Sequence, residues 1–199
     1  MFFYMDTIRT FIAITLPDDI HAQISMVINA LKKEIEYKVV HWVTPGNIHL
    51  TLKFLGEIPE SNILILQEEL GREPVTHECF SLGVQGIGAF PTLRKPRVIW
   101  VSVTEPKELM SLQERIETIT RKLGYDSENR PFSAHLTLGR VSHYATVQQI
   151  FHCGEVLSSC TVGRLGSFIV QSIEIYRSNL TAGGSVYTRL YSLPLKQVS

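Results

Sequence analysis

Two copies of the tetrapeptide His-Leu-Thr-Leu, at 49–52 and 135–138, are the strongest chemical signal in this sequence. The chain holds seven histidines and fifteen threonines, so the probability that one His-x-Thr pair occurs by chance is about one half. The full tetrapeptide occurring twice is a far more specific signal. In a β-strand, residues i and i+2 project from the same face. Each copy therefore presents one imidazole beside one hydroxyl, with its leucines on the opposite, core face.

This pairing suits the cleavage of a phosphodiester. One imidazole accepts a proton from the attacking oxygen and the other donates one to the leaving oxygen, because histidine titrates near neutral pH. The hydroxyls of Thr51 and Thr137 can donate hydrogen bonds to the non-bridging phosphate oxygens and hold the group between His49 and His135. The alternative without a chemical role is a pair of histidines that face solvent from strands, beside threonines that favour strand conformation. Because the two motifs are identical, they do not distinguish the proton donor from the acceptor.

A metal site is the competing use of histidine. His49 and His135 supply only two ligands, and neither has an Asp or Glu two or four residues further on. Zinc sites usually need three or four protein ligands, so we expect no metal and no other cofactor. The glycine-rich stretch 83–88 lies along a strand-like segment. It is expected to mark bulges or close backbone contacts rather than a phosphate-binding loop.

Strict alternation along the first motif predicts that Ile48, Leu50, Leu52 and Phe54 face the core. Lys53 then shares the face of His49, where it would add positive charge to the site or be solvated.

The two motifs are positioned by elements that occur twice. Residues 9–16 and 98–104 are predicted strands, and each precedes a helix that begins at a proline, Pro17 or Pro106. Helical spacing predicts the buried stripes Ile20, Ile24, Val27 and Leu31 in one helix, and Leu109, Leu112, Ile116, Ile119 and Leu123 in the other, which ends at Gly124. The motif follows 32 positions after the first proline and 29 after the second. This repeat indicates duplication of one lobe, and we expect residues 1–199 to form a single bilobal domain.

The rest of the chain fits the same α/β pattern. Strands are predicted at 80–84, 166–176 and 186–193, and shorter helices at 60–72 and 145–154.

Charge and composition limit the classes of partner. Nineteen basic residues balance nineteen acidic ones, which argues against a protein that coats long stretches of nucleic acid. An anionic partner must be held by a few placed groups, and Arg94, Lys95 and Arg97 form the one local basic cluster that we single out. Phe90, Trp42 and Tyr187 are candidates for stacking on a base, although aromatic residues in strands are more often core.

Cysteine usage and hydropathy point to the cytoplasm. The three cysteines (Cys79, Cys153 and Cys160) are an odd number without C-x-x-C spacing, which predicts buried, reduced thiols. No apolar run is long enough to span a bilayer, and the first six residues lack the basic region of a signal peptide. Met5 is an alternative start to Met1.

The sequence resembles the two-histidine (2H) phosphoesterases, and among them the bacterial and archaeal RNA 2′,3′-cyclic phosphodiesterases, formerly named 2′-5′ RNA ligases. The resemblance covers nearly the whole chain and includes WVTPGNIHLTLKFLG at 42–56 and RPFSAHLTLGR at 130–140. The other matching segments, in chain order, are 9–14, 88–91, 96–101, 172–178 and 184–187.

The resemblance implies an α+β fold, with two pseudo-symmetric lobes of antiparallel sheet, outer helices and a central cleft that bears both motifs. It implies hydrolysis of an RNA 2′,3′-cyclic phosphate end to a 2′-phosphate, by a monomer without an obligate protein partner. It makes His49 the proton donor to the 3′-oxygen and His135 the acceptor that activates water. Thr51, Thr137 and Arg140 would bind the phosphate, although strict alternation puts Arg140 on the face opposite His135 unless a bulge at Gly139 turns it back.

Alternatives remain within this resemblance. The same groups working in reverse would join RNA ends to a 2′-5′ linkage without ATP. The same fold would also suit small substrates, such as nucleotide or ADP-ribose cyclic phosphates, or a module that binds RNA ends without turnover. The family often has a proline where this chain has Ala134, and a glutamate where it has Gly46; neither position touches the imidazoles.

Overall fold

The computed structural model describes residues 6–72, 77–104, 106–128, 130–181 and 184–197, so the alternative start sites Met1 and Met5 lie outside the described residues. The strands are β1 (Thr7–Thr15), β2 (Val40–Trp42), β3 (His49–Pro59), β4 (Phe80–Thr92), β5 (Lys95–Val103), β6 (His135–Val141), β7 (Arg164–Val170), β8 (Ser172–Thr181) and β9 (Gly184–Pro194). The helices are α1 (Asp18–Glu34), α2 (Asn62–Arg72), α3 (Lys107–Lys122) and α4 (Val147–Ser159), with a short 3-10 helix, η1 (Pro45–Asn47).

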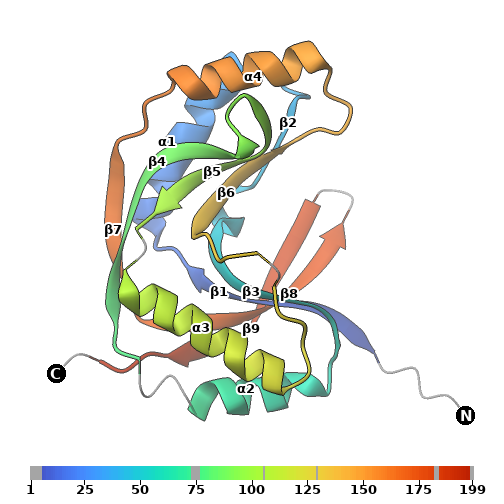
Figure 1. Ribbon diagram of the computed structural model, residues 1–199, viewed down its shortest axis with the longest axis vertical. Helices are drawn as coiled ribbons and strands as arrows, with labels where there is room; N and C mark the ends of the chain where they lie inside the picture. The colour runs from blue at the N-terminus through green and yellow to red at the C-terminus, as the bar shows by residue number, and fades with distance from the viewer. Residues whose placement is uncertain (1–5, 73–76, 105, 129, 182–183, 198–199) are drawn as a thin grey trace, which may run out of the picture.

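The strands form one curled sheet with two related halves (Figure 1). Its order is β7-β4-β5-β6-β3-β1-β8-β9, with β2 beside β6, and the pairings are antiparallel. The motif strands β3 and β6 meet at the centre. Outward from each lies the strand that precedes a long helix, β1 on one side and β5 on the other. The predicted α+β architecture of two pseudo-symmetric lobes is therefore confirmed.

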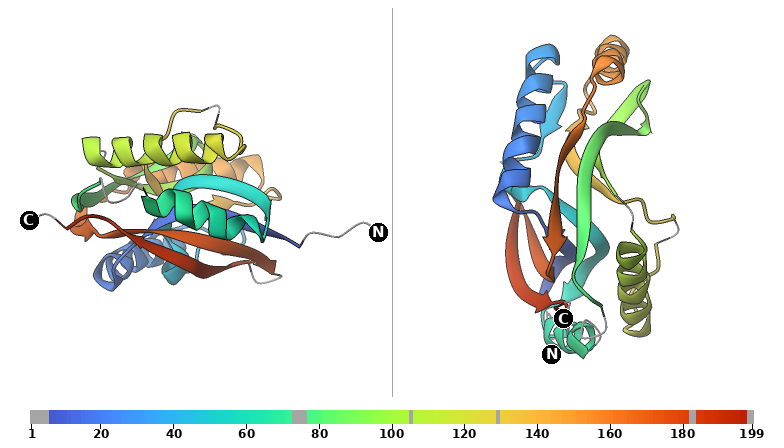
Figure 2. Two further views of the ribbon diagram at one scale, coloured as in Figure 1. Left: turned by 90° about the horizontal axis from the view of Figure 1, so that it is seen from below. Right: turned by 90° about the vertical axis from the view of Figure 1, so that its left-hand side faces the viewer.

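The long helices cross from one lobe to the other. β1 belongs to the lobe of β3, but α1, which follows it, contacts β7 and α4. β5 belongs to the lobe of β6, but α3 contacts β3 and α2. Figure 2 shows α1 and α3 on opposite sides of the molecule, with strands between them. Each lobe is therefore covered by a helix whose preceding strand lies in the other lobe.

Both long helices begin where the sequence predicts. Pro17 and Pro106 precede them in extended conformation, and Asp18 and Asp19 lie in the first turn of α1 near the positive end of the helix dipole. The buried stripe of α1 differs at one position, because Ile28 is buried where we expected Val27, which is only half-buried.

The predicted strand at 166–176 is wrong as a single element. β7 ends at Val170, which pairs with Phe80 of β4, and β8 begins at Ser172, which pairs with Pro194 of β9. The chain thus leaves one edge of the sheet and joins the other lobe at Gln171. Residue types that favour strands occur on both sides of this break, so propensity alone does not reveal it.

The glycine-rich stretch 83–88 lies within β4, as expected. The register with β5 shifts between Gln85 and Gly88, and Gly86 has a positive φ of 68°. A Cβ on Gly88 would lie 2.2 Å from the Trp100 ring, so this glycine allows a close approach of the indole. The prediction of a bulge and a close backbone contact is confirmed.

The three cysteines are unpaired, and only Cys153 is fully buried. Burial raises the pKa of the Cys153 thiol to about 11, so the thiol stays protonated at neutral pH. Cys79 and Cys160 are half-buried, which corrects the expectation of three buried thiols.

Within the described ranges, none of the helices combines the length and apolar character needed to cross a membrane.

Candidate active site

The two motifs meet where the lobes join. Leu50 of β3 pairs with Leu136 of β6 in an antiparallel register. One step along this register places Thr51 across from His135, and one step the other way places His49 across from Thr137. All four polar side chains alternate with buried leucines. They therefore share the sheet face opposite those leucines, as the sequence predicts.

Both imidazoles are held in the same tautomer. Nδ1 of His49 lies 2.8 Å from the carbonyl oxygen of Asn47, and Nδ1 of His135 lies 2.7 Å from that of Ser133. A carbonyl oxygen only accepts, so Nδ1 carries the proton in each ring. Nε2 is then the free nitrogen of each neutral imidazole, available to accept a proton or, once protonated, to donate one.

Aromatic rings surround His49. The Phe11 ring stacks on its imidazole with centroids 4.7 Å apart, and the nearly parallel Tyr176 ring lies 5.3 Å from Phe11 and 6.3 Å from His49. The Tyr187 ring meets His49 edge-on at 5.1 Å. Burial lowers the pKa of His49 below its ordinary value of 6.5, against a smaller opposing effect of the hydrogen bond to Asn47. The neutral imidazole is thus favoured at neutral pH.

His135 has fewer aromatic neighbours. The Phe90 ring lies edge-on to it with centroids 4.9 Å apart, and the Trp100 ring lies 6.4 Å away. The two reacting groups proposed from one repeated motif therefore have different surroundings, although their hydrogen bonds to the backbone are equivalent.

A bulge in β6 places Arg140 beside the site. Trp100 of β5 pairs with Thr137, but Ile99 pairs with Gly139, so Leu138 is the extra residue. Leu138 and Gly139 are both buried, and Arg140 emerges on the exposed side. Arg140 and His135 line the same cavity. The bulge that the sequence requires for Arg140 is present, and it resolves the conflict with strict alternation.

The same bulge occurs in β3, where it overturns two expectations. Thr51 pairs with Ala13 and Lys53 with Ile12, so Leu52 is the extra residue. As a result, Lys53 is buried, with 1% of its surface exposed, and Phe54 is 52% exposed. Lys53 neither adds charge beside His49 nor meets solvent, and Phe54 does not face the core.

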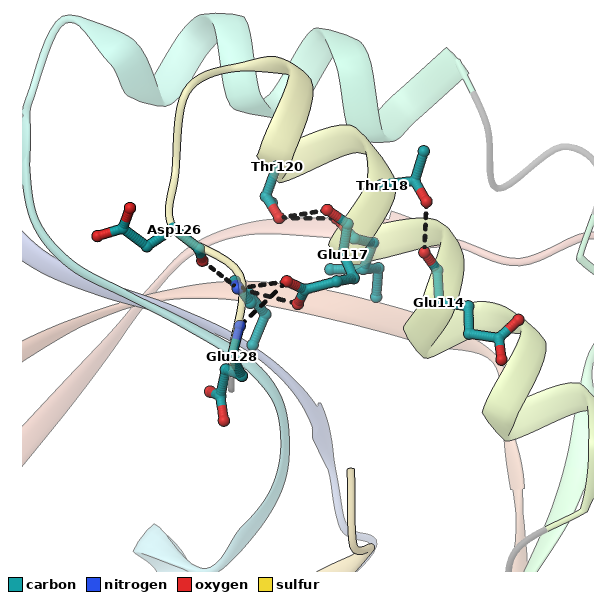
Figure 3. Close-up of polar contacts among 8 residues, drawn as sticks. Glu114, Glu117, Thr118, Thr120, Asp126 and Glu128 are labelled. Carbon is teal, nitrogen blue, oxygen red and sulfur yellow. Dashed lines mark hydrogen bonds and ion pairs between the residues drawn. The ribbon is translucent and has the colours of Figure 1, made fainter. Parts of the chain in front are cut away.

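Lys53 instead ties the first motif to the chain that leads to the second. Its Nζ lies 2.9 Å from Glu117 of α3 and donates to the carbonyl oxygen of Asp126 at 2.6 Å. Glu117 also accepts a hydrogen bond from the backbone N–H of Glu128 (Figure 3). The buried lysine therefore helps to position the segment that precedes β6.

A cavity of about 580 Å³ opens beside His135. It is lined by Thr51, Leu52, Phe54, Phe90, Pro91, Arg97, Val98, Gln113, Glu128, Arg130, Pro131, Phe132, Ser133, His135 and Arg140. Thr51 and His135, which lie across from each other at the junction, both belong to this lining, whereas the neighbouring pair of His49 and Thr137 does not. Of the basic cluster at 94–97, only Arg97 reaches the cavity.

The aromatic candidates separate in the same way. Phe90 lines the cavity and contacts His135, whereas Tyr187 contacts His49. Trp42 belongs to neither group. Its ring packs against Gly139, and a Cβ added to that glycine would lie 3.0 Å from the ring.

Sequence reasoning missed several residues that surround the site. Phe11 and Tyr176 cover His49 from β1 and β8, and Gln113 reaches the cavity from α3. Phe11 and Tyr176 carried no chemical signal, because aromatic residues in strands are usually core, and Gln113 on α3 belongs to no motif. In the described part of the chain, His, Cys, Asp and Glu side chains form no group of three or more that could hold a metal ion.

The chain is similar to known proteins in sequence and in fold. The family model LigT like Phosphoesterase matches residues 14–100. An RNA 2′,3′-cyclic phosphodiesterase of Archaeoglobus fulgidus is 31% identical, over 92% of this chain and 97% of the relative. One of Thermotoga maritima is 33% identical, over 92% and 93% respectively. The crystal structure of E. coli LigT complexed with 3′-AMP is 29% identical and superposes with a TM-score of 0.77, over 96% of this chain and 100% of that one.

Proposed function

The chain belongs to the LigT-like phosphoesterase family, and from this premise we propose that it hydrolyses the 2′,3′-cyclic phosphate at an RNA end to a 2′-phosphate. The observation that carries the proposal is that the two His-x-Thr pairs meet where Leu50 pairs with Leu136. Each Nδ1 is hydrogen-bonded to a backbone carbonyl oxygen, which leaves each Nε2 free. Two titrating groups on either side of one phosphate suit turnover better than capture, for which arginine or lysine would serve.

The reaction divides between the two imidazoles. Nε2 of His135 accepts a proton from a water molecule as its oxygen attacks phosphorus. The bond between phosphorus and the 3′-oxygen breaks, and the protonated Nε2 of His49 donates its proton to that oxygen. The products are a free 3′-hydroxyl and a 2′-phosphate. With its lowered pKa, the donor form of His49 increases as the pH falls below neutral.

Three side chains hold the phosphate during this step. The hydroxyls of Thr51 and Thr137 donate hydrogen bonds to its non-bridging oxygens, and Arg140 neutralises the charge that develops on them. The bulge at Leu138 supports this role for Arg140, because it turns the guanidinium toward the cavity that His135 lines. Run backward, the same two proton transfers would join a cyclic phosphate end to a 5′-hydroxyl without ATP.

We further propose that residues 1–199 form one bilobal domain and act as a monomer in the cytoplasm, without an obligate protein partner. The crossing of α1 and α3 between the lobes supports one domain, and the three unpaired cysteines suit a reducing compartment.

Phosphorus NMR of the protein incubated with an oligoribonucleotide ending in a 2′,3′-cyclic phosphate tests the activity directly. We expect the cyclic phosphate resonance to be replaced by that of a 2′-phosphomonoester. An unchanged substrate together with measurable binding would instead identify a module that captures RNA ends. Conversion of small cyclic phosphates alone would move the substrate to that class.

A further inference from the structure

The cavity lies on one side of the proposed reacting pair. Its lining includes Thr51 and His135, but neither His49 nor Thr137. A volume of about 580 Å³ is typical of sites that hold a whole small molecule and exceeds what one phosphate group occupies. If the cyclic phosphate sits between the imidazoles, the remainder of the substrate extends past His135 into this space.

Positive charge is concentrated in the cavity. Arg97 comes from β5, Arg140 from β6, and Arg130 from the segment that leads to β6. All three are exposed, and none forms a salt bridge in the described parts of the chain. Glu128 is the one acidic residue of the lining. Three guanidinium groups against one carboxylate is a local excess in a chain whose formal net charge is zero.

This excess is more than the reacting phosphate needs. Arg140 serves that phosphate in the proposed function, which leaves Arg97 and Arg130 without a ligand. A planar guanidinium binds phosphate oxygens through two parallel hydrogen bonds, and arginine is favoured where phosphates are recognised. Two arginines that share one cavity and form no salt bridge in the described parts of the chain therefore point to a second phosphate.

Aromatic side chains complete the lining. Phe54, which the β3 bulge turns outward, shares the cavity with Phe90 and Phe132. Unpaired RNA bases stack on such rings, and this stacking favours binding whichever base is present. Phe54 also occupies the position in β3 that Arg140 occupies in β6, two residues after the bulged leucine. The pseudo-symmetric lobes thus offer a ring on one side and a cation on the other.

We infer that this cavity is a subsite for the 3′-terminal nucleoside of RNA together with the phosphodiester on its 5′ side, which Arg97 and Arg130 bind. The inference rests on the proposed function and narrows its substrate class. An RNA end carries a second phosphate one nucleoside away from the cyclic one, whereas a nucleoside 2′,3′-cyclic phosphate does not. The enzyme therefore prefers oligonucleotide ends to single nucleoside cyclic phosphates.

Three substrates isolate the second phosphate. They are adenosine 2′,3′-cyclic phosphate, the dinucleotide ApA ending in the same cyclic phosphate, and that dinucleotide with a neutral methylphosphonate in place of its internucleotide phosphate. We expect kcat/KM to be about ten- to hundredfold higher for the natural dinucleotide than for the other two, the range expected for hydrogen bonds to a charged group.

Arginine variants assign the effect to residues. Arg97→Gln and Arg130→Gln should each lower kcat/KM for the natural dinucleotide about tenfold and leave that for adenosine 2′,3′-cyclic phosphate unchanged. Arg94→Gln is the matched control, because Arg94 is exposed in the same basic cluster but does not line the cavity. It should leave all three substrates unchanged. Equal rates on all three substrates in the unaltered protein, or equal losses on all three in the variants, would overturn the inference.

A binding measurement separates this inference from the proposed function. Titration calorimetry with ApA 2′-phosphate, its methylphosphonate analogue and adenosine 2′-phosphate reports the same subsite without turnover. If no substrate is hydrolysed but the natural dinucleotide still binds tighter through Arg97 and Arg130, the proposed hydrolysis fails and the subsite stands. If hydrolysis is normal and the three ligands bind alike, the subsite fails and the hydrolysis stands.

Discussion

Nζ of Lys53 lies 2.9 Å from the carboxylate of Glu117, with 1% of the lysine side chain exposed and 23% of the glutamate. This pair links the bulge of the first motif strand to α3, and through Asp126 and Glu128 to the segment that precedes the second motif. The side chain that the sequence suggested as added charge beside His49, or as solvated, is therefore part of the scaffold that brings the motifs together.

Removing Glu117 should destabilise the fold more than removing Lys53. Glu117→Gln leaves an ammonium buried without its counterion, and we expect a loss of about 3 kcal/mol in the free energy of unfolding. Lys53→Met leaves a carboxylate on a side chain that is 23% exposed and that still accepts a hydrogen bond from the N–H of Glu128, so its loss should be smaller. Urea denaturation measures both values. The exposed pair of Arg72 with Glu69 supplies the control, because Arg72→Gln should cost about 0.5 kcal/mol or less.

Each motif histidine should be essential for turnover but not for folding. We expect His49→Ala and His135→Ala each to lower kcat about 10²- to 10⁴-fold, the usual contribution of a general acid or base. Circular dichroism should show an unchanged fold. A rate like that of the unaltered protein in either variant would rule out the two-histidine mechanism.

A sulfur leaving group should tell the donor from the acceptor. Thiolate departs without protonation more readily than alkoxide, so a cyclic substrate with sulfur at the 3′ position bypasses the general acid. We expect this substrate to restore most of the rate to His49→Ala and little to His135→Ala. The reverse pattern would make His49 the acceptor and His135 the donor. The lowered pKa of His49 is compatible with that exchange, because it favours the neutral form that accepts protons.

His49 should titrate below 6.5 in the folded protein, because burial disfavours the imidazolium. Proton NMR of its Cε1–H gives the midpoint. Tyr187→Ala uncovers one edge of the ring and should raise that midpoint toward 6.5, whereas Tyr144→Ala, at a residue 95% exposed, should not. Since the unfolded chain binds a proton at a higher pH than the folded one, the contribution of His49 to stability is lost as the pH falls from 6.5 through its lowered pKa.

Chelation should leave the activity intact. The proposed steps use only imidazole, hydroxyl and guanidinium groups, so dialysis against EDTA should not change kcat or KM. If activity is lost and returns on addition of a divalent cation, a metal ion binds the phosphate, and the two-histidine mechanism is wrong.

The two lobes should unfold together. Because α1 covers the lobe that β1 does not belong to, and α3 does the same for β5, neither lobe keeps its cover when the other opens. Thermal unfolding followed by circular dichroism and by tryptophan fluorescence should give coincident single transitions. Two separated transitions would show that the lobes are independent domains.

The features that depend on local pattern could be predicted from the sequence. The repeated His-Leu-Thr-Leu, the prolines that open α1 and α3, and the helical spacing of their apolar residues indicated two related lobes with an imidazole and a hydroxyl from each. These features are local because strand alternation and helix periodicity act over a few residues. The resemblance to the family rests on the same segments.

The features that depend on pairing between distant strands could not be predicted from the sequence. A bulge exists relative to a partner strand, so the reversal of Lys53 and Phe54 required β1, and the placement of Arg140 required β5. The break at Gln171 likewise reflects two different pairing partners, β4 and β9. Local pattern predicted which side chains react, but the register of strands far apart in the chain determined which side chains surround them, because one residue of slip turns a side chain to the other face of the sheet.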